Sequence, residues 1–494
     1  MNETASPAFS CVVETRQLRL FKLNNTRRSW SVYLLVGLDP EAIAMLQSLY
    51  SRSSMSIEKR IREIFEKEQR ETGEAQKSQP ARADAETEAM VHRLMQTFYV
   101  GYGHQSIGDC GTVTLFIEDV PIHLPTQIQD SALYSGQEMS TRFIAYANAR
   151  LLDPIGTPVS GLMLERWMGF LQHASPIMTE ALKLENPLIV DATAGSEESQ
   201  KKNWERAIYA RTCDILRGFL PSSAVTSVSW SVNLRQAIDH LRRLQHHPDI
   251  LVRELALDVV DLLRAMYPSS FGHKEREETA TWLDVSARET AEHVEGAKNT
   301  SIRVTIEDLA RYRRIEALLA TRPRSADVSR HFGNIAQISV KTQLDQGSYR
   351  DLHRHRVIDQ PVSLMVWDGA VHPFYLDALP SELRAEATEL LRKQFALYDQ
   401  LSDQDPYLRQ CYAPLGQLVP LDMRGDLGAF IYMLELRSKP DVHPTARALV
   451  HEIADRLLEQ LPALTLHVNR EPSRFNLKRG NQTIFNKTTG EAIA

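Results

Sequence analysis

Hydrophobic positions recur at strand and helix spacings along most of the chain. Apolar, β-branched runs predict strands at 11–23 and 31–37, and the alternation of Val113, Leu115 and Ile117 predicts a strand at 112–120. Apolar residues three and four apart predict helices in the first half at 39–50, 56–73, 87–102, 126–132, 161–182, 201–218, 234–244 and 249–266. The segments 74–86 and 135–146 are polar and predict exposed or irregular chain.

A second series of elements begins after a turn-rich, charged stretch at 268–280, which we interpret as a linker. It starts with the segment 304–319, continues with a strand at 335–343 followed by the segment 349–356, and ends with helices at 381–401, 426–437 and 445–461. The same order of elements thus occurs twice, namely helix, strand, polar segment, long helix, Pro-containing loop and paired helices. The pattern predicts an α+β fold of two tandem domains, 1–275 and 276–494, each a mixed sheet packed with long helices.

Composition narrows the class of protein. The 494 residues carry a net charge of -6, which gives no general attraction to nucleic acid or to a membrane surface. The four cysteines (Cys11, Cys110, Cys213 and Cys411) lie far apart, so we expect no disulfide framework or metal site, and a cytoplasmic location. The polar N-terminal ten residues predict no signal peptide, and no apolar run reaches the roughly 18 residues of a membrane helix.

A cluster of cations is the first candidate for chemistry. Arg350, His353, Arg354, His355 and Arg356 lie within seven residues. Arginine binds phosphate through two parallel hydrogen bonds, so the cluster is a candidate anion site. The alternative is a solvated basic helix face.

Two polar segments of the first half are further candidates. Ser135, Glu138, Ser140 and Arg142 alternate with other residues, as would suit a ligand with phosphate and sugar groups, although a capped polar loop gives the same pattern. The segment 230–235, Trp-Ser-Val-Asn-Leu-Arg, precedes a helix that carries Arg242 and Arg243. Its Asn233 could bind a ligand or simply cap the helix.

Taken together, these segments resemble the flavin-dependent thymidylate synthases. The resemblance runs through 103–106 (Gly-His-Gln-Ser), through 112–143 without a gap, through 217–221 (Arg-Gly-Phe-Leu-Pro) and through 230–235. This half departs from the family at 130–132, where Asp-Ser-Ala replaces Arg-His-Arg, and at 109–110, where Asp-Cys replaces Glu-His. The first half therefore resembles the family's nucleotide-binding side without its phosphate-binding arginines.

The second half shows the opposite departure. Its strand and the segment 350–356 resemble the family's strand and Arg-His-Arg, and Leu436-Arg437 resembles a later Leu-Arg whose arginine lies at the nucleotide. Pro361–Val366 replaces the family's Glu-x-Ser-x-Arg, and Asp426 and Gly428 occupy its Asn-x-Arg positions. Because the family builds each active site across subunits, the resemblance implies one composite site from two degenerate repeats.

The resemblance assigns roles to individual residues. It implies catalytic roles for Arg354, Arg142 and Arg437. It implies cofactor binding by Arg354, His355, Arg356, His104, Ser106, Asn233 and Arg235, and substrate binding by Glu138, Ser140, Arg142, Arg217 and Arg243. His104 could equally be a hydrogen-bonded core histidine.

The implied activity is reductive methylation of carbon 5 of dUMP or a related pyrimidine nucleotide. The implied cofactor is FAD, with methylenetetrahydrofolate and NADPH as co-substrates, and the family's assembly implies a homodimer that forms a pseudo-tetramer. Two alternatives stay open, namely flavin-dependent modification of a different pyrimidine nucleotide and a non-catalytic nucleotide- or flavin-binding paralogue.

Overall fold

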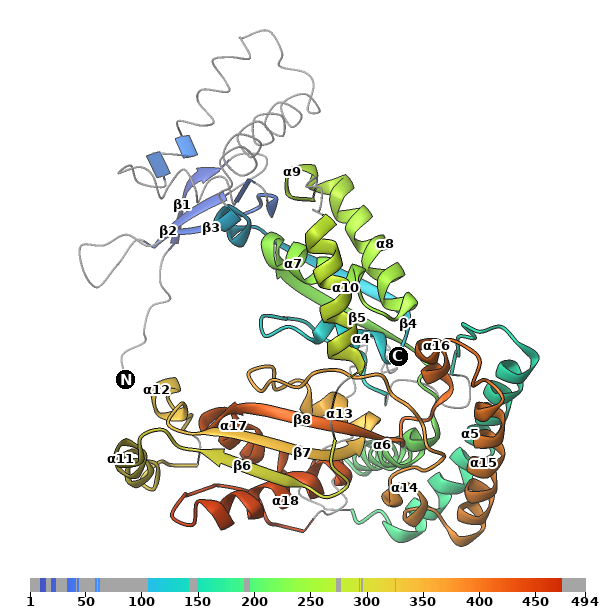
Figure 1. Ribbon diagram of the computed structural model, residues 1–494. Helices are drawn as coiled ribbons and strands as arrows, with labels where there is room; N and C mark the ends of the chain where they lie inside the picture. The colour runs from blue at the N-terminus through green and yellow to red at the C-terminus, as the bar shows by residue number, and fades with distance from the viewer. Residues whose placement is uncertain are drawn as a thin grey trace. The chain divides into compact units, whose positions relative to one another are not determined.

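The computed structural model describes residues 105–472 apart from 142–148, 191–195, 272–276, 293, 295 and 325, together with the short stretches 9–14, 19–23, 33–40, 42–43, 58–59 and 61–62 (Figure 1). The chain divides into two compact units. The first comprises residues 1–115, 231–245 and 255–279, and the second comprises 116–230, 246–254 and 280–494.

The first unit contains a small antiparallel sheet of strands β1 (Phe9–Glu14), β2 (Arg19–Leu23) and β3 (Tyr33–Val36), in that order. Helix α7 (Leu234–Gln245) packs against the 3₁₀ helix Gln105–Cys110 and against the short helix α9 (Pro268–Phe271). Most of helix α8 (Ile250–Met266) also belongs to this unit.

Strands β4 (Thr112–Pro121) and β5 (Val225–Asn233) pair with each other. In β5 the buried positions Thr226, Val228, Trp230 and Val232 alternate with half-buried ones, which is the period of a strand with one covered face. Helix α4 (Leu124–Gln129) follows β4 and is almost wholly buried.

The second unit contains the antiparallel sheet β6 (Ser301–Thr305), β7 (Gln337–Asp345) and β8 (Leu418–Asp426), with β7 in the centre. Helix α18 (Pro444–Gln460) lies along β6 and β7, with α17 (Leu427–Arg437) beside it (Figure 1). Helices α11 (Leu309–Leu319), α12 (Arg330–Gly333) and α13 (Gln346–Leu352) complete this part. Its core is formed by apolar residues of β7, β8, α17 and α18, and the partly buried Ile302 and Val304 of β6 pack against it.

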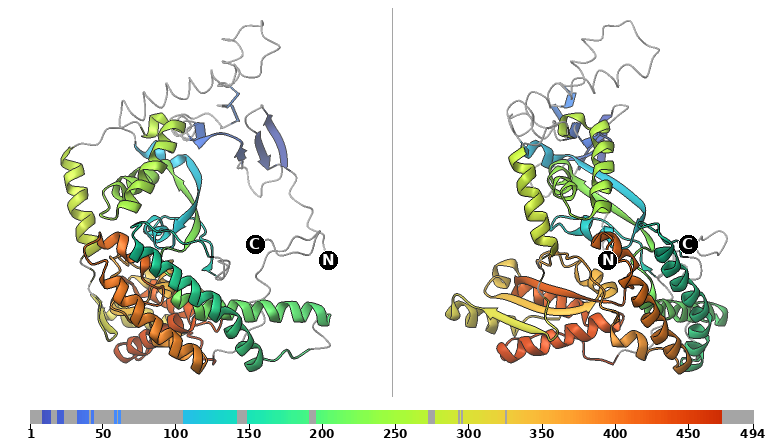
Figure 2. Two further views of the ribbon diagram at one scale, coloured as in Figure 1. Left: turned by 90° about the vertical axis from the view of Figure 1, so that its right-hand side faces the viewer. Right: turned by 45° about the vertical axis from the view of Figure 1, so that its right-hand side comes forward.

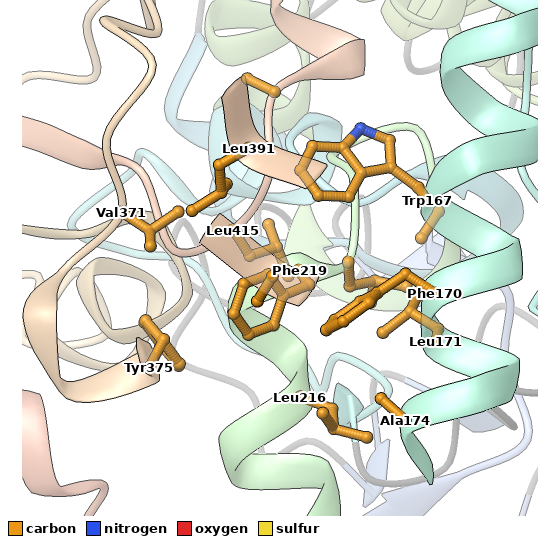
Figure 3. Close-up of a cluster of buried hydrophobic side chains, with 14 of the residues drawn as sticks. Trp167, Phe170, Leu171, Ala174, Leu216, Phe219, Val371, Tyr375, Leu391 and Leu415 are labelled. Carbon is orange, nitrogen blue, oxygen red and sulfur yellow. The ribbon is translucent and has the colours of Figure 1, made fainter. Parts of the chain in front are cut away.

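A helical layer forms the other core of the second unit. Helix α5 (Pro158–Glu185) begins at a capping box in which Thr157 and Ser160 satisfy each other's backbone donors, and it lies beside α15 (Ser381–Asp399) (Figure 2). Its buried stripe packs with residues far along the chain, including Phe219, Tyr375 and Leu415 (Figure 3). The remaining elements are α6 (Glu197–Leu216), α10 (Glu277–Glu292), α14 (Pro373–Asp377), α16 (Pro406–Arg409) and the 3₁₀ turns Arg217–Phe219 and Gln410–Tyr412.

The structure confirms the α+β class and most of the predicted elements. The linker predicted at 268–280 is wrong in part, because Pro268–Phe271 is helical and α10 begins at Glu277. The predicted helices at 56–73 and 87–102, the polar excursion at 74–86 and the tail at 474–494 lie largely or wholly outside the described residues. The two compact units do not follow the boundary at 275/276, and the division into tandem domains stays a prediction.

Candidate anion-binding site

The cationic cluster directly follows a short, well-capped helix. Strand β7 ends at Asp345, whose carboxylate accepts a hydrogen bond from the Ser348 backbone N at 2.9 Å and so caps α13. The helix ends at His353, and Arg354, His355 and Arg356 form the turn that follows. The turn leaves Arg354 exposed and Arg356 half-buried, and it buries His355.

These residues line a cavity of about 680 Å³ in the second unit. Its cationic lining comprises four arginines against two aspartates, so an anion is the favoured ligand. The walls come from the segment after α4, from α12 and the residues before it, and from α17. The charged and aromatic lining residues are Tyr134, Asp327, Arg330, Arg354, His355, Arg356, Asp426, Tyr432 and Arg437.

Arg356 is held by residues more than 200 positions earlier in the chain. Its guanidinium lies 4.4 Å from the centre of the Tyr134 ring, and its Nε donates to the Gln129 carbonyl at 3.3 Å. The Tyr134 hydroxyl donates to the Ser229 carbonyl at 2.6 Å. The cavity therefore combines the first-half segment around Tyr134 with the second-half turn at 354–356.

His355 and Arg437 form a second fixed pair at the cavity. The Nε of Arg437 donates to Nε2 of His355 at 2.9 Å, so this ring nitrogen is an acceptor and the imidazole is neutral. Burial, together with the charge of Arg437, lowers the pKa of His355 to about 3. The imidazole meets Tyr432 edge-on, with 5.8 Å between ring centres.

Glu138, predicted to bind substrate, is fully engaged by protein groups. It forms a buried ion pair with Arg350, in which the two side chains are 3% and 7% exposed. Its second oxygen accepts a hydrogen bond from Gln129 Nε2 at 2.9 Å. Glu138 is not among the cavity-lining residues, so in this arrangement it supports the neighbouring turn.

Arg217, also predicted to bind substrate, is buried away from the cavity lining. It donates to Ser348 Oγ at 2.6 Å and to the Tyr375 hydroxyl at 3.3 Å, and it lies 3.8 Å from Asp345. Burial lowers the pKa of Arg217, but the neighbouring Tyr375 and Asp345 outweigh burial and raise it overall. These contacts give Arg217 a structural role.

The other predicted residues of the first unit each have local partners. Asn233 accepts from the Gln236 backbone N at 2.8 Å and so caps α7, which was one of its two predicted roles. Arg235 donates to Asp109 at 2.8 Å, Arg243 contacts His240 Nδ1 at 2.8 Å, and Ser106 is exposed.

Three predicted ligand-binding residues of the first half remain. Ser140 is half-buried in the second unit, and His104 and Arg142 lie outside the described residues. Asp130, which replaces an arginine of the family, has its carboxylate 3.6 Å from His353 Nε2.

Arg330 is a cavity residue that sequence reasoning missed. It is the first residue of α12, it is exposed, and it adds a fourth guanidinium to the lining. A signal was available, because Arg330 precedes the strand β7 by about as many residues as the Gly-His-Gln-Ser segment precedes β4.

One known protein family matches part of the chain. Residues 41–269 match the family described as thymidylate synthase complementing protein. This stretch is therefore related to the flavin-dependent thymidylate synthases, which confirms the resemblance noted in the first half of the sequence. It includes Tyr134 and ends well before the cationic turn at 354–356.

Two similar proteins extend the likeness over more of the chain. A "UPF0159 protein" of Chlamydia pneumoniae is 20% identical, over 94% of this chain and 96% of its own length. A "UPF0159 protein" of Chlamydia muridarum (strain MoPn / Nigg) is 21% identical, over 73% of this chain and 78% of its own.

Across the described residues, no three His, Cys, Asp or Glu side chains are grouped as a metal site. None of the helices in that part of the chain is both long and apolar enough to span a membrane.

Proposed function

We propose that the chain is an FAD-dependent, thymidylate synthase-like enzyme that methylates carbon 5 of dUMP or a related pyrimidine nucleotide, with methylenetetrahydrofolate and NADPH as co-substrates. One observation carries the proposal. The cavity joins Tyr134, from the family-matched region, to the arginines at 354, 356 and 437, which lie outside that region.

The donor set fits a flavin dinucleotide. A diphosphate needs several cations, and four guanidiniums line the cavity. A flavin ring needs apolar surface, and Ala132, Val328, Ile358 and Leu436 are apolar lining residues. Bound flavin would supply the hydride chemistry, and the protein would supply binding, orientation and electrostatics.

The residues of this chain divide that work. Arg354, the most exposed arginine of the turn, is assigned to phosphate. Arg356 and Arg437, each fixed by a neighbouring ring, are assigned to the negative charge that develops on the pyrimidine. The neutral His355 orients Arg437. Arg142, Ser140 and His104 keep the roles that the family resemblance implies.

We also propose that the chain arose by tandem duplication, because two local structures recur. Strands β5 and β8 each run into a helix capped by the strand's last residue, Asn233 in one case and Asp426 in the other. A further contact recurs in the two segments His247-Pro248-Asp249 and His443-Pro444-Thr445. In each, the histidine Nδ1 accepts from the backbone N two residues later, at 3.0 and 3.4 Å.

The Pro-containing segments around Pro221 and Pro414 also contact each other through equivalent residues. Pro221 and Pro414 form an antiparallel bridge. Leu415 N donates to Leu220 O at 2.8 Å, and Ser222 N donates to Ala413 O at 2.9 Å. A symmetric contact of this kind is what a fused pair of like domains produces. On this basis we propose a homodimer that forms a pseudo-tetramer, and we propose that it is cytoplasmic. Light scattering during gel filtration measures the mass of the assembly.

One observation favours the second candidate, modification of a pyrimidine nucleotide other than dUMP. Glu138 and Arg217 are occupied by protein partners, so the nucleotide contacts differ from those that the family resemblance implies. A screen of pyrimidine nucleotides for substrate-dependent NADPH oxidation separates the two candidates.

Flavin content is the test of the proposal. We expect the purified protein to carry flavin, and Arg354→Ala and Arg356→Ala to lose it. Arg392→Ala is the matched control, because this arginine is 69% exposed on α15 and forms a surface ion pair with Glu389. Wild-type protein that binds no flavin after reconstitution with excess FAD would refute the enzyme proposal.

A further inference from the structure

One corner of the anion cavity differs from its counterpart in the first half of the chain. Strands β5 and β8 each run into a helix that is capped by the last residue of the strand. Two residues after the cap, the first half carries Arg235, whose Nε donates to Asp109 at 2.8 Å. The second half carries Gly428 at that position, so the start of α17 offers no guanidinium there.

A second glycine lies directly against Gly428. Gly428 is the second residue of α17, and Gly333 is the last residue of α12. A Cβ on Gly428 would lie 2.8 Å from the Gly333 Cα, and a Cβ on Gly333 would lie 2.9 Å from the Gly428 Cα. Both distances are too short for a side chain, because the opposing atoms belong to the backbone and cannot rotate away. Only a pair of glycines therefore allows α12 to lie this close to the first turn of α17.

The close approach of these two helices fixes the place of Arg330. Because α12 spans only four residues, the position of Gly333 at its end determines that of Arg330 at its start. The helix is held further by Arg311, whose Nη2 donates to the His331 carbonyl at 3.0 Å. Arg330 is exposed, and it lines the cavity together with both glycines. The guanidinium that the second half lacks at its strand-to-helix turn is thus supplied from α12.

We infer that Arg330 binds the anion of the cavity and that Gly333 and Gly428 are positioning residues, which act through the place they give to α12. On this wall the positive charge comes from α12 instead of the strand-to-helix turn. In the corresponding corner of the first half, Arg235 is engaged in an ion pair with Asp109. The chemical identity of the anion rests on the proposed function, whereas the positioning by the two glycines does not.

Arg330 is tested with two ligands, inorganic pyrophosphate and FAD, by calorimetric titration of the full-length protein stripped of ligand. Arg330→Ala should weaken the binding of both by about 5- to 10-fold, because a charge-assisted hydrogen bond is lost. Arg330→Lys keeps the charge and should recover part of the loss. Arg314→Ala is the matched control and should bind as wild type does, because this arginine is exposed on α11 and is not among the cavity-lining residues.

The two glycines are tested by their dependence on Arg330. Gly428→Ala should weaken pyrophosphate binding by about the same factor, because the added methyl group pushes α12 away from α17. Gly333→Ala, which acts from the other side of the contact, should do the same. The double variant Gly428→Ala/Arg330→Ala should bind within about twofold of Arg330→Ala, because both changes act on one guanidinium. Thermal unfolding shows that each variant is folded.

The outcomes separate this inference from the proposed function. If Arg330→Ala binds both ligands as wild type does, its role at the anion is overturned. If the effects of Gly428→Ala and Arg330→Ala add in the double variant, the methyl group acts by filling the cavity, and the positioning role is overturned. If pyrophosphate binds in an Arg330-dependent way but FAD does not bind, the inference stands and the flavin function is overturned. If neither ligand binds wild type, both are overturned.

Discussion

The three arginines of the family motifs differ in how firmly the protein holds each of them. Arg356 lies against the Tyr134 ring, and Arg437 is tied to His355, whereas the 40% exposed side chain of Arg354 lies 4.0 Å from Asp351. The sequence could predict that these cations matter, because they are concentrated in a few residues. It could not predict the Arg350–Glu138 pair, because those partners are 212 residues apart and only the fold brings them together.

That buried pair supports a first prediction. Glu138→Ala should destabilise the protein by about 3–5 kcal/mol, because it leaves the Arg350 charge buried without its partner. Urea unfolding measures the loss. Replacing both residues with apolar ones, Glu138→Leu/Arg350→Met, should cost less than the single change. Glu389→Ala, at an exposed pair, should leave stability nearly unchanged, and an equally small effect of Glu138→Ala would contradict the argument.

Buried histidines support a second prediction, a stability maximum near neutral pH. Burial lowers the pKa of His355 to about 3 and those of His247 and His443 to about 4. The unfolded chain binds these protons first, so their contribution is present above about pH 6.5 and is lost as pH falls towards 4. Each pKa unit corresponds to about 1.4 kcal/mol, so we expect a loss of a few kcal/mol.

His123 affects the stability of the protein at alkaline pH. Burial opposes its charge, but contacts with Cys411 and Asp249 outweigh burial and raise its pKa to about 10. Its contribution is full below about pH 6.5 and is lost as pH rises towards 10. Urea unfolding from pH 4 to 10 checks both limbs. His443→Gln should flatten the acid limb and His123→Gln the alkaline limb, whereas unchanged slopes would count against these assignments.

At the scale of elements, the sequence predicted most helices because their apolar stripes repeat over many turns, as in α5 and α15. Separate strands at β5 and β8 were not predicted from the sequence. In β5 the buried positions alternate with serines, so the strand period is carried by few apolar residues. The predicted linker failed where Glu277 and Glu278 begin a helix, since acidic residues in a first turn are also a helix-start signal.

The turn that follows α6 supports a third prediction. A Cβ on Gly218 would lie 2.3 Å from the Tyr375 ring, so Gly218→Ala should destabilise the protein by about 1–3 kcal/mol. Gly169→Ala in α5 is the counterpart. Apart from its chain neighbours and its own helix backbone, no atom of the described residues lies within 4 Å of its Cβ position, and alanine favours the helix, so stability should rise by about 0.5–1 kcal/mol. Thermal unfolding of both variants checks the prediction, and equal effects would overturn it.

At the scale of the molecule, the two sequence halves share a core. Trp167 and Phe219 of the first half belong to the same buried cluster as Trp367, Tyr375 and Tyr412 of the second, and Trp167 Nε1 donates to the Tyr412 carbonyl at 3.1 Å. Repetition in the sequence suggested two domains side by side. It could not show this shared core, because side-chain packing between repeats leaves no periodic signal.

The shared core supports a fourth prediction. Residues 1–275 and 276–494, produced separately, should each be largely insoluble or loosely packed, since each leaves half of this core exposed. Produced together, they should associate and recover flavin binding. Solubility, near-ultraviolet circular dichroism and co-purification measure this. Two independently folded, soluble halves would contradict the prediction.

The contact between Arg356 and Tyr134 has a consequence for inheritance. Both partners are encoded in one gene, so a mutation at either position can be compensated at the other within the same copy. Related sequences should therefore keep or lose the aromatic ring at 134 together with the guanidinium at 356. In an assembly of separately encoded subunits, such paired changes would have to arise in two genes, which would make them rarer.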